Sequence, residues 1–339
     1  MNDTSTDRAF CERMLPGVSR TFALTIRLLP PGLEYPVLVA YLLCRVADTI
    51  EDSTLLPVAL KVSLLEHFRT CLDDDGPDAA ALHAAFAGTS DEETLAREAD
   101  IVLREFRRLP GAQRAAIRPW VQEMCTGMAS FVAAGGSEGS GRLQMLASVE
   151  ELERYCYFVA GTVGHLLTAL FRLHDGEMTE AQYQRLESLA TSFGLGLQMT
   201  NIVKDVADDR GRGVSFVPRE LFETSGIKPE DLPAAARDGL AGRVMQPLIA
   251  RARRHLASAL DYCTTLPRRQ YRIRLFCLTS LYFAARTLRL ARREPALLGG
   301  ERKIKISRGA VYRTLAMTYL VAPVDALVRA YFVRLEGAG

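Results

Sequence analysis

The sequence lacks the features that would assign it to several common protein classes. Its cysteines form no CxxC pair and are odd in number: Cys11, Cys44, Cys71, Cys125, Cys156, Cys263 and Cys277. This usage favours buried thiols in a reducing cytoplasm over a disulfide framework. The five histidines form no ligand cluster, and no motif places a base beside a serine or cysteine nucleophile.

Long apolar runs and an excess of charge are also missing. Segments such as 36–44 and 314–324 are shorter than the roughly 20 residues that span a bilayer, and the polar first eight residues do not resemble a signal peptide. A net charge of only +2 does not suggest a nucleic-acid partner. We expect a cytoplasmic protein without a transmembrane anchor, in contact with the inner membrane at most peripherally.

Neither period-two strand patterns nor a Rossmann fingerprint occurs. Helical periodicity runs through nearly the whole chain and predicts an all-α fold, with helices at about 58–71, 92–107, 111–132, 149–172, 241–265, 269–294 and 309–334. A chain of 339 residues with 48% hydrophobic content can bury a sizeable core in one large domain or two ordinary ones. We expect a single domain over 1–339, with a flexible glycine-rich loop near 133–145 and an amphipathic last helix at 309–334.

A polar stripe crosses the otherwise apolar segment 37–50. Its members are spaced four, three and four residues apart, so that one helix face carries Tyr41, Arg45, Asp48 and Asp52, with Glu51 beside them. Buried carboxylates without a partner cost several kcal/mol. Mg²⁺ is the expected partner, because it takes carboxylate oxygens and completes its shell with waters and substrate phosphates.

A second stretch, 194–210, repeats this arrangement on another apolar helix. Its stripe is spaced three, four and four and consists of Gln198, Asn201, Asp205 and Asp209, with Asp208 beside them. For either stretch alone, a solvated acidic helix face is an equal alternative. The two together favour acidic helices that face one another across a cavity.

Five motifs fall in the order and spacing of the squalene/phytoene synthase family: SRTF (19–22), DTIED (48–52), YCYFVAGTVG (155–164), QMTNIVKDVADD (198–209) and FCLTS (276–280). The chain resembles this family from about residue 15 to 315. The resemblance implies an all-α isoprenoid synthase fold with two aspartate-rich helices facing across a central cavity. It also implies an enzyme that joins two prenyl diphosphates head to head, with Mg²⁺ on the diphosphates.

The resemblance assigns roles to residues of these motifs. The implied metal ligands are Asp48, Glu51, Asp52, Asp205, Asp208 and Asp209. Residues that meet diphosphate oxygens or line a dry aromatic pocket are the implied substrate contacts: Ser19, Arg20, Phe22, Tyr41, Arg45, Gln198, Asn201, Lys204 and Tyr282. The implied catalytic residues are Tyr155, Phe276 and Arg45, with Tyr155 in proton removal or cation steering. For Tyr155 and Phe276 the alternative is core packing.

Two stretches favour the squalene-type branch, whose members reduce a cyclopropyl diphosphate made from farnesyl diphosphate with hydride from NADPH. The segment 127–131 (GMASF) resembles a helix of that branch. The stretch 299–309 resembles its basic loop, in which Lys303, Lys305 and Arg308 would contact the phosphates of NADPH. A solvated basic loop or a contact to anionic lipid is the alternative for this loop.

Some residues depart from the family pattern. Lys204 stands where the family usually has Arg, which keeps the charge but loses the bidentate fork. Ser280 stands where squalene-type enzymes often have Pro, and the segment 210–218 resembles a phytoene-type stretch. The product therefore stays open between squalene, phytoene or dehydrosqualene, and presqualene diphosphate. A non-catalytic prenyl-binding protein is the remaining alternative, and the complete acidic motifs disfavour it.

Overall fold

The structure is a computed structural model that describes residues 4–135, 143–299 and 304–337. Helices dominate these ranges, and the strands found in them are β1 (Gln144–Met145) and β2 (Val214–Ser215), which pair in parallel. The predicted all-α class is confirmed, although no sequence pattern indicated this small ladder. The chain forms two compact units, residues 1–138 with 165–178 and residues 139–164 with 179–339. Each unit is described by itself, and the single domain stays a prediction.

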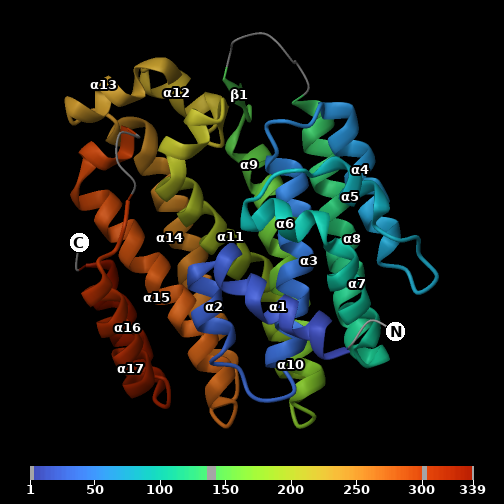
Figure 1. Cartoon of the computed structure of the whole chain (residues 1–339). Helices are drawn as coiled ribbons and strands as arrows, with labels where there is room; N and C mark the ends of the chain where they lie inside the picture. The colour runs from blue at the N-terminus through green and yellow to red at the C-terminus, as the bar shows by residue number, and fades with distance from the viewer. Residues whose placement is uncertain (1–3, 136–142, 300–303, 338–339) are drawn as a thin grey trace. The chain divides into compact units, whose positions relative to one another are not determined.

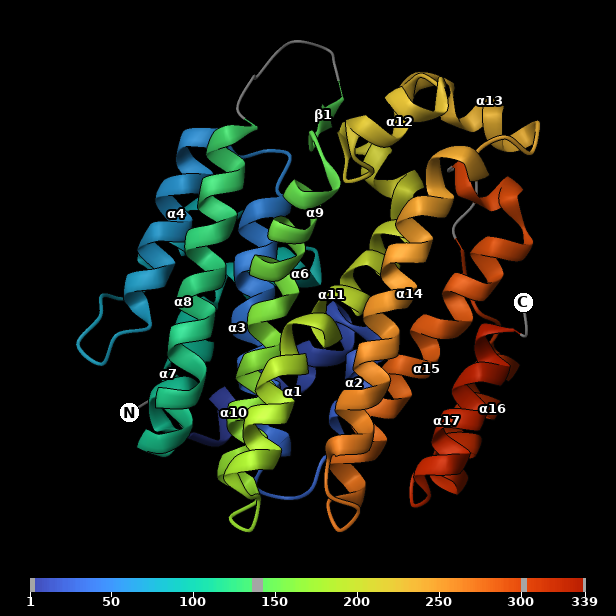
Figure 2. The ribbon, with the colours of Figure 1, turned by 180° about the vertical axis from the view of Figure 1, so that it is seen from behind.

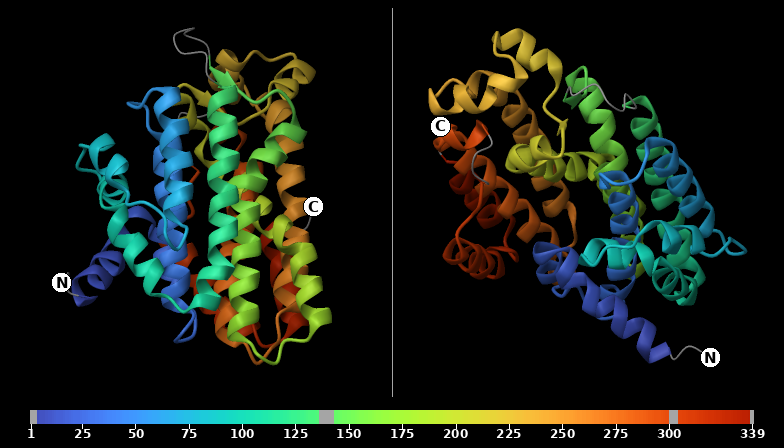
Figure 3. Two further views of the ribbon diagram at one scale, coloured as in Figure 1. Left: turned by 90° about the vertical axis from the view of Figure 1, so that its right-hand side faces the viewer. Right: turned by 45° about the horizontal axis from the view of Figure 1, so that its top comes forward.

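The first unit is built around α3. Its helices are α1 (Thr4–Val18), α2 (Arg20–Ile26), α3 (Glu34–Asp52), α4 (Val58–Cys71), α5 (Ala80–Ala85), α6 (Asp91–Arg97), α7 (Ala99–Arg108), α8 (Gly111–Ala134) and most of α10 (Thr162–His174). The apolar residues of α3, from Val39 to Ile50, are almost all fully buried against α1, α4, α6, α7 and α8. The helices α4 and α8 lie side by side in two different views (Figures 2 and 3).

The second unit is built around α11 (Glu180–Gly211), which begins with a capping box of Thr179 and Gln182. Besides the two strands it contains α9 (Val149–Cys156), the π-helical turn η1 (Tyr157–Gly161), α12 (Arg219–Ser225), η2 (Pro229–Asp231), α13 (Leu232–Arg237), α14 (Gly242–Thr265), α15 (Tyr271–Arg293), η3 (Pro295–Gly299), α16 (Arg308–Val321) and α17 (Asp325–Glu336). The helices α14 and α15 pack against α11 and each other (Figure 1).

Four of the predicted helices, at 58–71, 111–132, 241–265 and 269–294, are confirmed to within two residues at either end. Two segments that were each predicted as one continuous helix are in fact interrupted. The segment 92–107 is two helices, α6 and α7, that meet at Glu98, and 309–334 is the two helices α16 and α17. Pro323 explains the second break, because proline has no N–H to donate and its ring clashes with the carbonyl group four residues earlier in a helix. Part of the predicted loop 133–145 lies outside the described residues.

All seven cysteines are free thiols and buried, as predicted. One stretch, Val149–His174, meets the length and hydropathy of a membrane-crossing helix, and half of its most apolar window is buried inside the protein. Core helices of globular proteins meet the same two criteria, and the burial of this stretch favours that interpretation over a membrane span. In the second unit this stretch contributes α9 and η1, which pack on α11.

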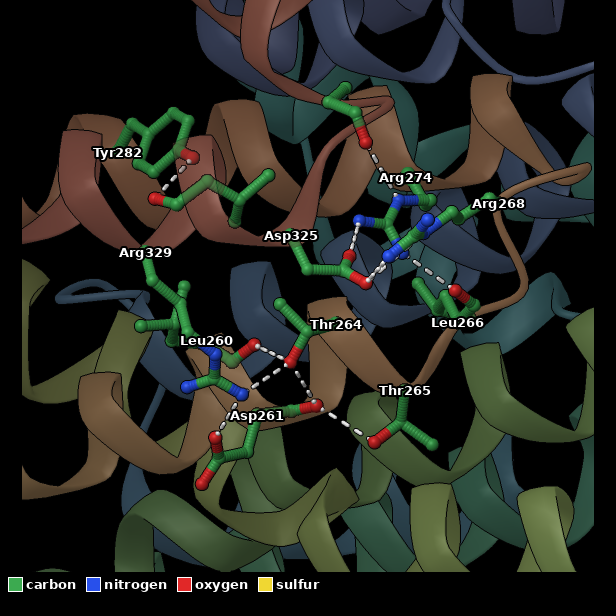
Figure 4. A network of polar contacts seen from close by, with 12 residues as sticks. Leu260, Asp261, Thr264, Thr265, Leu266, Arg268, Arg274, Tyr282, Asp325 and Arg329 are labelled. Atoms are coloured by element: carbon green, nitrogen blue, oxygen red, sulfur yellow. Dashed lines mark hydrogen bonds and ion pairs between the residues drawn. The ribbon is translucent and has the colours of Figure 1, made fainter.

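A buried arginine ties the turn between α16 and α17 to the turn between α14 and α15 (Figure 4). The side chain of Arg274 is fully buried and donates to the carbonyl oxygens of Ala322 at 3.0 Å and Leu266 at 2.8 Å, and to Asp325 at 2.5 Å. Arg268 adds a contact of 2.6 Å to the same carboxylate. Burial alone would raise the pKa of Asp325, but hydrogen bonds from the two arginines hold it below the ordinary value, so the carboxylate stays charged.

This clamp predicts a large loss of stability when Arg274 is replaced by Leu. The change removes the donor to two carbonyl groups and leaves the carboxylate with the exposed Arg268 alone, and breaking a buried pair in this way costs about 3–5 kcal/mol. The matched control is Arg268→Ala, since Arg268 meets the same carboxylate but is 65% exposed, and such a pair contributes less than about 1 kcal/mol. Urea unfolding followed by circular dichroism measures both. Equal losses in the two variants would contradict the assignment.

Candidate functional site

The first acidic stripe contains an arginine with an unused donor. In α3 the Nη1 of Arg45 lies 3.4 Å from Oδ2 of Asp48, and its Nη2 lies 3.5 Å from Oε1 of Glu92 in α6. The Nε of Arg45 is buried and has no hydrogen-bond partner. A buried donor left unpaired costs about 1–3 kcal/mol, so the geometry favours an anionic ligand that accepts from it. Sequence reasoning missed Glu92, because no spacing pattern connects it to α3.

The carboxyl group of Asp48 is only partly neutralised. Burial raises its pKa to about 6, the nearby charge of Asp52 adds to this, and Arg45 acts in the opposite direction. Along the stripe, Asp48 keeps 33% of its side chain exposed, and Asp52 is exposed at the end of the helix. A divalent cation held by these two carboxylates would remove both the repulsion between them and the cost of burial.

The SRTF segment lies against this stripe. Ser19 caps α2 by accepting a hydrogen bond of 3.1 Å from the backbone N–H of Phe22, and Arg20 is the first residue of that helix. The ring of Phe22 lies 5.2 Å from that of Tyr41 at a tilt of 37°. Burial raises the pKa of Tyr41 to about 12, although Ser19 and Arg45 oppose the shift. The first unit thus brings the predicted residues of α2 and α3 together.

The second stripe lies on the C-terminal half of α11. Lys204 is 3.1 Å from the carboxylate of Asp205 and donates to Oδ1 of Asn201 at 3.2 Å. Asp209 is buried and forms an ion pair of 2.7 Å with Arg212, a residue that sequence reasoning missed. At the two ends of the stripe, Gln198 is half-buried and Asp208 is exposed, while Glu51 of the first stripe is half-buried.

The predicted aromatic residues of the second unit have different environments. Tyr155 is 5% exposed, and its ring stacks on Phe216 at 4.8 Å. Phe276 is buried in α15. Tyr282, one and a half turns further along α15, is fully buried and donates its hydroxyl to the carbonyl oxygen of Val328 at 3.1 Å. Tyr282 therefore packs α15 against α17, and its role as a substrate contact stays a prediction.

At two glycines, the backbones of η1 and the start of α10 lie very close to the backbone of α11. A Cβ on Gly194 would lie 2.1 Å from the carbonyl oxygen of Ala160, and a Cβ on Gly164 would lie 2.2 Å from the carbonyl oxygen of Ala190. Neither backbone has room for a methyl group. Gly164 of the 155–164 motif and Gly194 of α11 thus allow the two backbones to lie close together, shortly after Tyr155 in the sequence.

The predicted basic loop is described in part. Lys303 lies outside the described residues, whereas Lys305 and Arg308 are exposed. Ser307 caps α16, because its hydroxyl accepts a hydrogen bond of 3.2 Å from the backbone N–H three residues on. Arg308 is the first residue of α16, so a basic side chain and the positive end of a helix dipole occur together. This combination suits a phosphate group.

Mg²⁺ fits the acidic stripes by the chemistry of its donors. In the part of the chain that is described, no group of three or more His, Cys, Asp or Glu side chains could hold a metal ion by itself. Mg²⁺ does not need such a group, since it binds through one or two carboxylates and fills its shell with waters and substrate phosphates. Asp48 with Asp52 and Asp205 with Asp209 are two such pairs, each four residues apart on a helix. That the two helices face one another stays a prediction.

Comparisons of the sequence with known proteins support the family resemblance seen in the motifs. A family model for squalene/phytoene synthase matches residues 15–310. Squalene synthase 1 of Arabidopsis thaliana is 30% identical over 319 residues, which cover 93% of this chain and 72% of that protein. Squalene synthase ERG9 of Gibberella zeae is 29% identical over 299 residues, which cover 88% of this chain but 61% of the fungal protein. The chain thus spans less than two thirds of that relative.

Solved structures agree with these matches. TcSQS in complex with a ligand superposes with a TM-score of 0.80 at 26% identity, over 97% of this chain and 91% of that one. A dehydrosqualene synthase superposes with a TM-score of 0.61 at 19% identity, over 93% of this chain and 95% of that one, and shares the fold. The all-α isoprenoid synthase class predicted from the sequence is confirmed.

The glycine contact predicts a sharp difference between two alanine substitutions in α11. Gly194→Ala should lower the free energy of unfolding by about 1–3 kcal/mol, because the methyl group meets fixed backbone. Gly211→Ala is the matched control, since nothing lies within 4 Å of its added Cβ, and it should be neutral or slightly stabilising. Denaturant unfolding of both variants gives the comparison. A neutral Gly194→Ala would show that the two backbones are not in close contact.

Proposed function

Because the chain belongs to the squalene/phytoene synthase family, we propose that it is a prenyltransferase that joins two farnesyl diphosphate molecules head to head and reduces the product with NADPH to squalene. The observation that carries the proposal is Arg45, whose buried Nε has no acceptor although its guanidinium lies between two carboxylates. A substrate diphosphate supplies that acceptor. The similarity to proteins named squalene synthase supports the squalene branch.

In this proposal the acidic stripes hold Mg²⁺, which supplies positive charge to the leaving diphosphate. Asp48 and Asp52 are the ligands on α3, and Asp205 and Asp209 are those on α11. Arg45 and Lys204 donate hydrogen bonds to diphosphate oxygens. Arg212 limits the freedom of Asp209, because the 2.7 Å ion pair fixes the orientation of that carboxylate.

Aromatic side chains protect the allylic cation that remains when the diphosphate leaves. Phe22 and Tyr41 form a paired aromatic surface beside Arg45, and π-faces stabilise cations where water is excluded. With its pKa raised to about 12, Tyr41 stays neutral at physiological pH. Tyr155, held by its stack on Phe216, is the proposed residue for proton removal or cation steering.

The reduction step depends on a second anion site. Lys305 and Arg308, with the capped start of α16, suit the phosphates of NADPH. If that site holds no dinucleotide, the chain is a phytoene-type, dehydrosqualene or presqualene diphosphate synthase, an alternative that Ser280 and the segment 210–218 favour. The cytoplasmic location stays a prediction.

Product identification tests the proposed function. Purified protein is incubated with farnesyl diphosphate and Mg²⁺, with and without NADPH, and the extracted products are identified by mass spectrometry. We expect squalene with NADPH and a diphosphate or dehydrogenated product without it. The same hydrocarbon in both reactions would overturn the reduction step, and unreacted substrate in both would support a non-catalytic prenyl-binding protein.

Removing one carboxylate charge from either stripe should abolish most of the activity. Asp48→Asn and Asp205→Asn keep the side-chain shape, so turnover should fall by at least about 100-fold while the helices remain. Asp75→Asn, at an exposed aspartate outside the stripes, is the control and should keep full activity. Steady-state kinetics and far-ultraviolet circular dichroism are the measurements. Normal turnover in either stripe variant would refute the metal assignment.

Neutralising the basic loop should separate the two half-reactions. In the variant with Lys303, Lys305 and Arg308 all changed to Gln, condensation continues and presqualene diphosphate accumulates, because each charge-assisted hydrogen bond to NADPH is worth about 1.5–3 kcal/mol. The control changes three exposed basic residues elsewhere, Arg219, Lys228 and Arg243, to Gln. Product ratios at rising NADPH concentration measure the effect. Normal reduction in the loop variant would show that the loop does not bind NADPH.

A further inference from the structure

A second basic site lies in the second unit, on helices other than α11, which carries the acidic stripe of that unit. The helices α15, α16 and α17 enclose a pocket of about 750 Å³. Its lining includes five arginines: Arg286, Arg289, Arg293, Arg313 and Arg334. The rest of the lining is apolar or aromatic apart from Gly337, and it contains no Asp or Glu. We name this site the arginine pocket.

The positive charge of the arginine pocket is not balanced within the described part of the chain. None of the five arginines forms an ion pair there with a carboxylate. Glu336, the acid nearest in sequence to Arg334, pairs with Arg253 at 2.9 Å instead. The Nε of Arg286 is buried without a hydrogen-bond partner. Burial lowers the pKa of Arg289, and the like charges of its arginine neighbours act in the same direction.

An exposed apolar surface continues from the pocket to the turn between α16 and α17. Tyr319 is 46%, Leu320 70%, Val324 43% and Leu327 49% exposed. Leu320 follows Met317 of the pocket by three residues, so both lie on the same side of α16. We name these four residues the hairpin tip. The hairpin of α16 and α17, red in Figure 1, is held by the clamp of Arg274 on Asp325 (Figure 4), so this exposure belongs to the folded state.

We propose that the arginine pocket binds the phosphate head group of an anionic phospholipid and that the hairpin tip enters the surface of the bilayer. Guanidinium groups match phosphate oxygens in a bidentate geometry, and basic residues beside exposed apolar ones are typical of surfaces that lie on anionic membranes. A soluble diphosphate would satisfy the arginines but would leave the hairpin tip without a role. The site shares no residue with the proposed catalytic machinery.

Vesicle sedimentation of the full chain tests this proposal. Vesicles of phosphatidylcholine alone are compared with vesicles that also contain phosphatidylglycerol. We expect at least about tenfold stronger binding to the anionic vesicles, weakening as salt rises. The variant with Arg289, Arg293 and Arg313 changed to Gln should lose at least about tenfold of that binding. The variant with Leu320 and Leu327 changed to Ser should lose severalfold.

The matched control removes the same charge from elsewhere in the second unit, by changing the exposed Arg219, Arg243 and Arg254 to Gln. It should bind anionic vesicles as the wild type does. If the pocket variant does not fold, Arg313→Gln alone serves, since Arg313 is exposed, and a fall of about fivefold is expected. Circular dichroism verifies the fold of every variant.

Three outcomes would overturn the proposal. The first is a pocket variant that binds anionic vesicles as well as the control does. The second is an equal loss in both triple variants, which would mean that binding depends on net charge alone. The third is wild-type protein that ignores the vesicles but binds inorganic pyrophosphate in calorimetry with an affinity that the pocket variant loses, which would make the arginine pocket a site for a soluble anion.

Discussion

Close approach between helix backbones at the glycines of α11 is the constraint on which the second unit depends. On one side Gly194 meets the backbone of η1, and on the other a Cβ at Gly196 would lie 3.1 Å from the backbone nitrogen of Leu256 in α14. A helix fixed on both sides cannot rotate or slide without a clash, because protein interiors are close-packed. The acidic stripe begins within one turn of these contacts. The direction in which the side chains of this stripe point is therefore determined by backbone packing that involves no charged side chain.

The two stripes differ in how they balance their carboxylates. On α3, Asp48 shares Arg45 with Glu92 of another helix, and the arginine keeps an unused buried donor. On α11, Asp205 pairs with Lys204 of the same helix, and Asp209 pairs with Arg212 directly after the helix ends. Ion pairs of this kind contribute little to stability and are often replaced by apolar residues without loss. Their presence on helices with apolar cores is explained by ligand binding better than by folding.

Periodicity predicted most helices because each buries one apolar face, and that signal is local. Periodicity did not reveal the breaks between α6 and α7 and between α16 and α17, because the apolar spacing continues across Glu98 and Pro323 although the helices end there. For the site, motif spacing placed Arg45 beside Asp48 correctly. It could not find Glu92, which reaches Arg45 only through the folding of α6 onto α3. Nor could it show that Tyr282 points toward α17, because the neighbours on each face of α15 are decided by tertiary packing.

A net charge of +2 conceals a strong separation of charge along the chain. Carboxylates mark α3 and α11, whereas the pocket of α15, α16 and α17 is lined by arginines and no acid. In the two proposals these arrangements bind anions through different interactions. A carboxylate-rich surface takes a phosphate when a cation lies between them, while guanidinium groups contact phosphate oxygens directly. Removal of divalent cations should therefore abolish phosphate binding at the acidic stripes but leave phosphate binding by the arginine pocket intact. The two sites can then be studied separately in one protein.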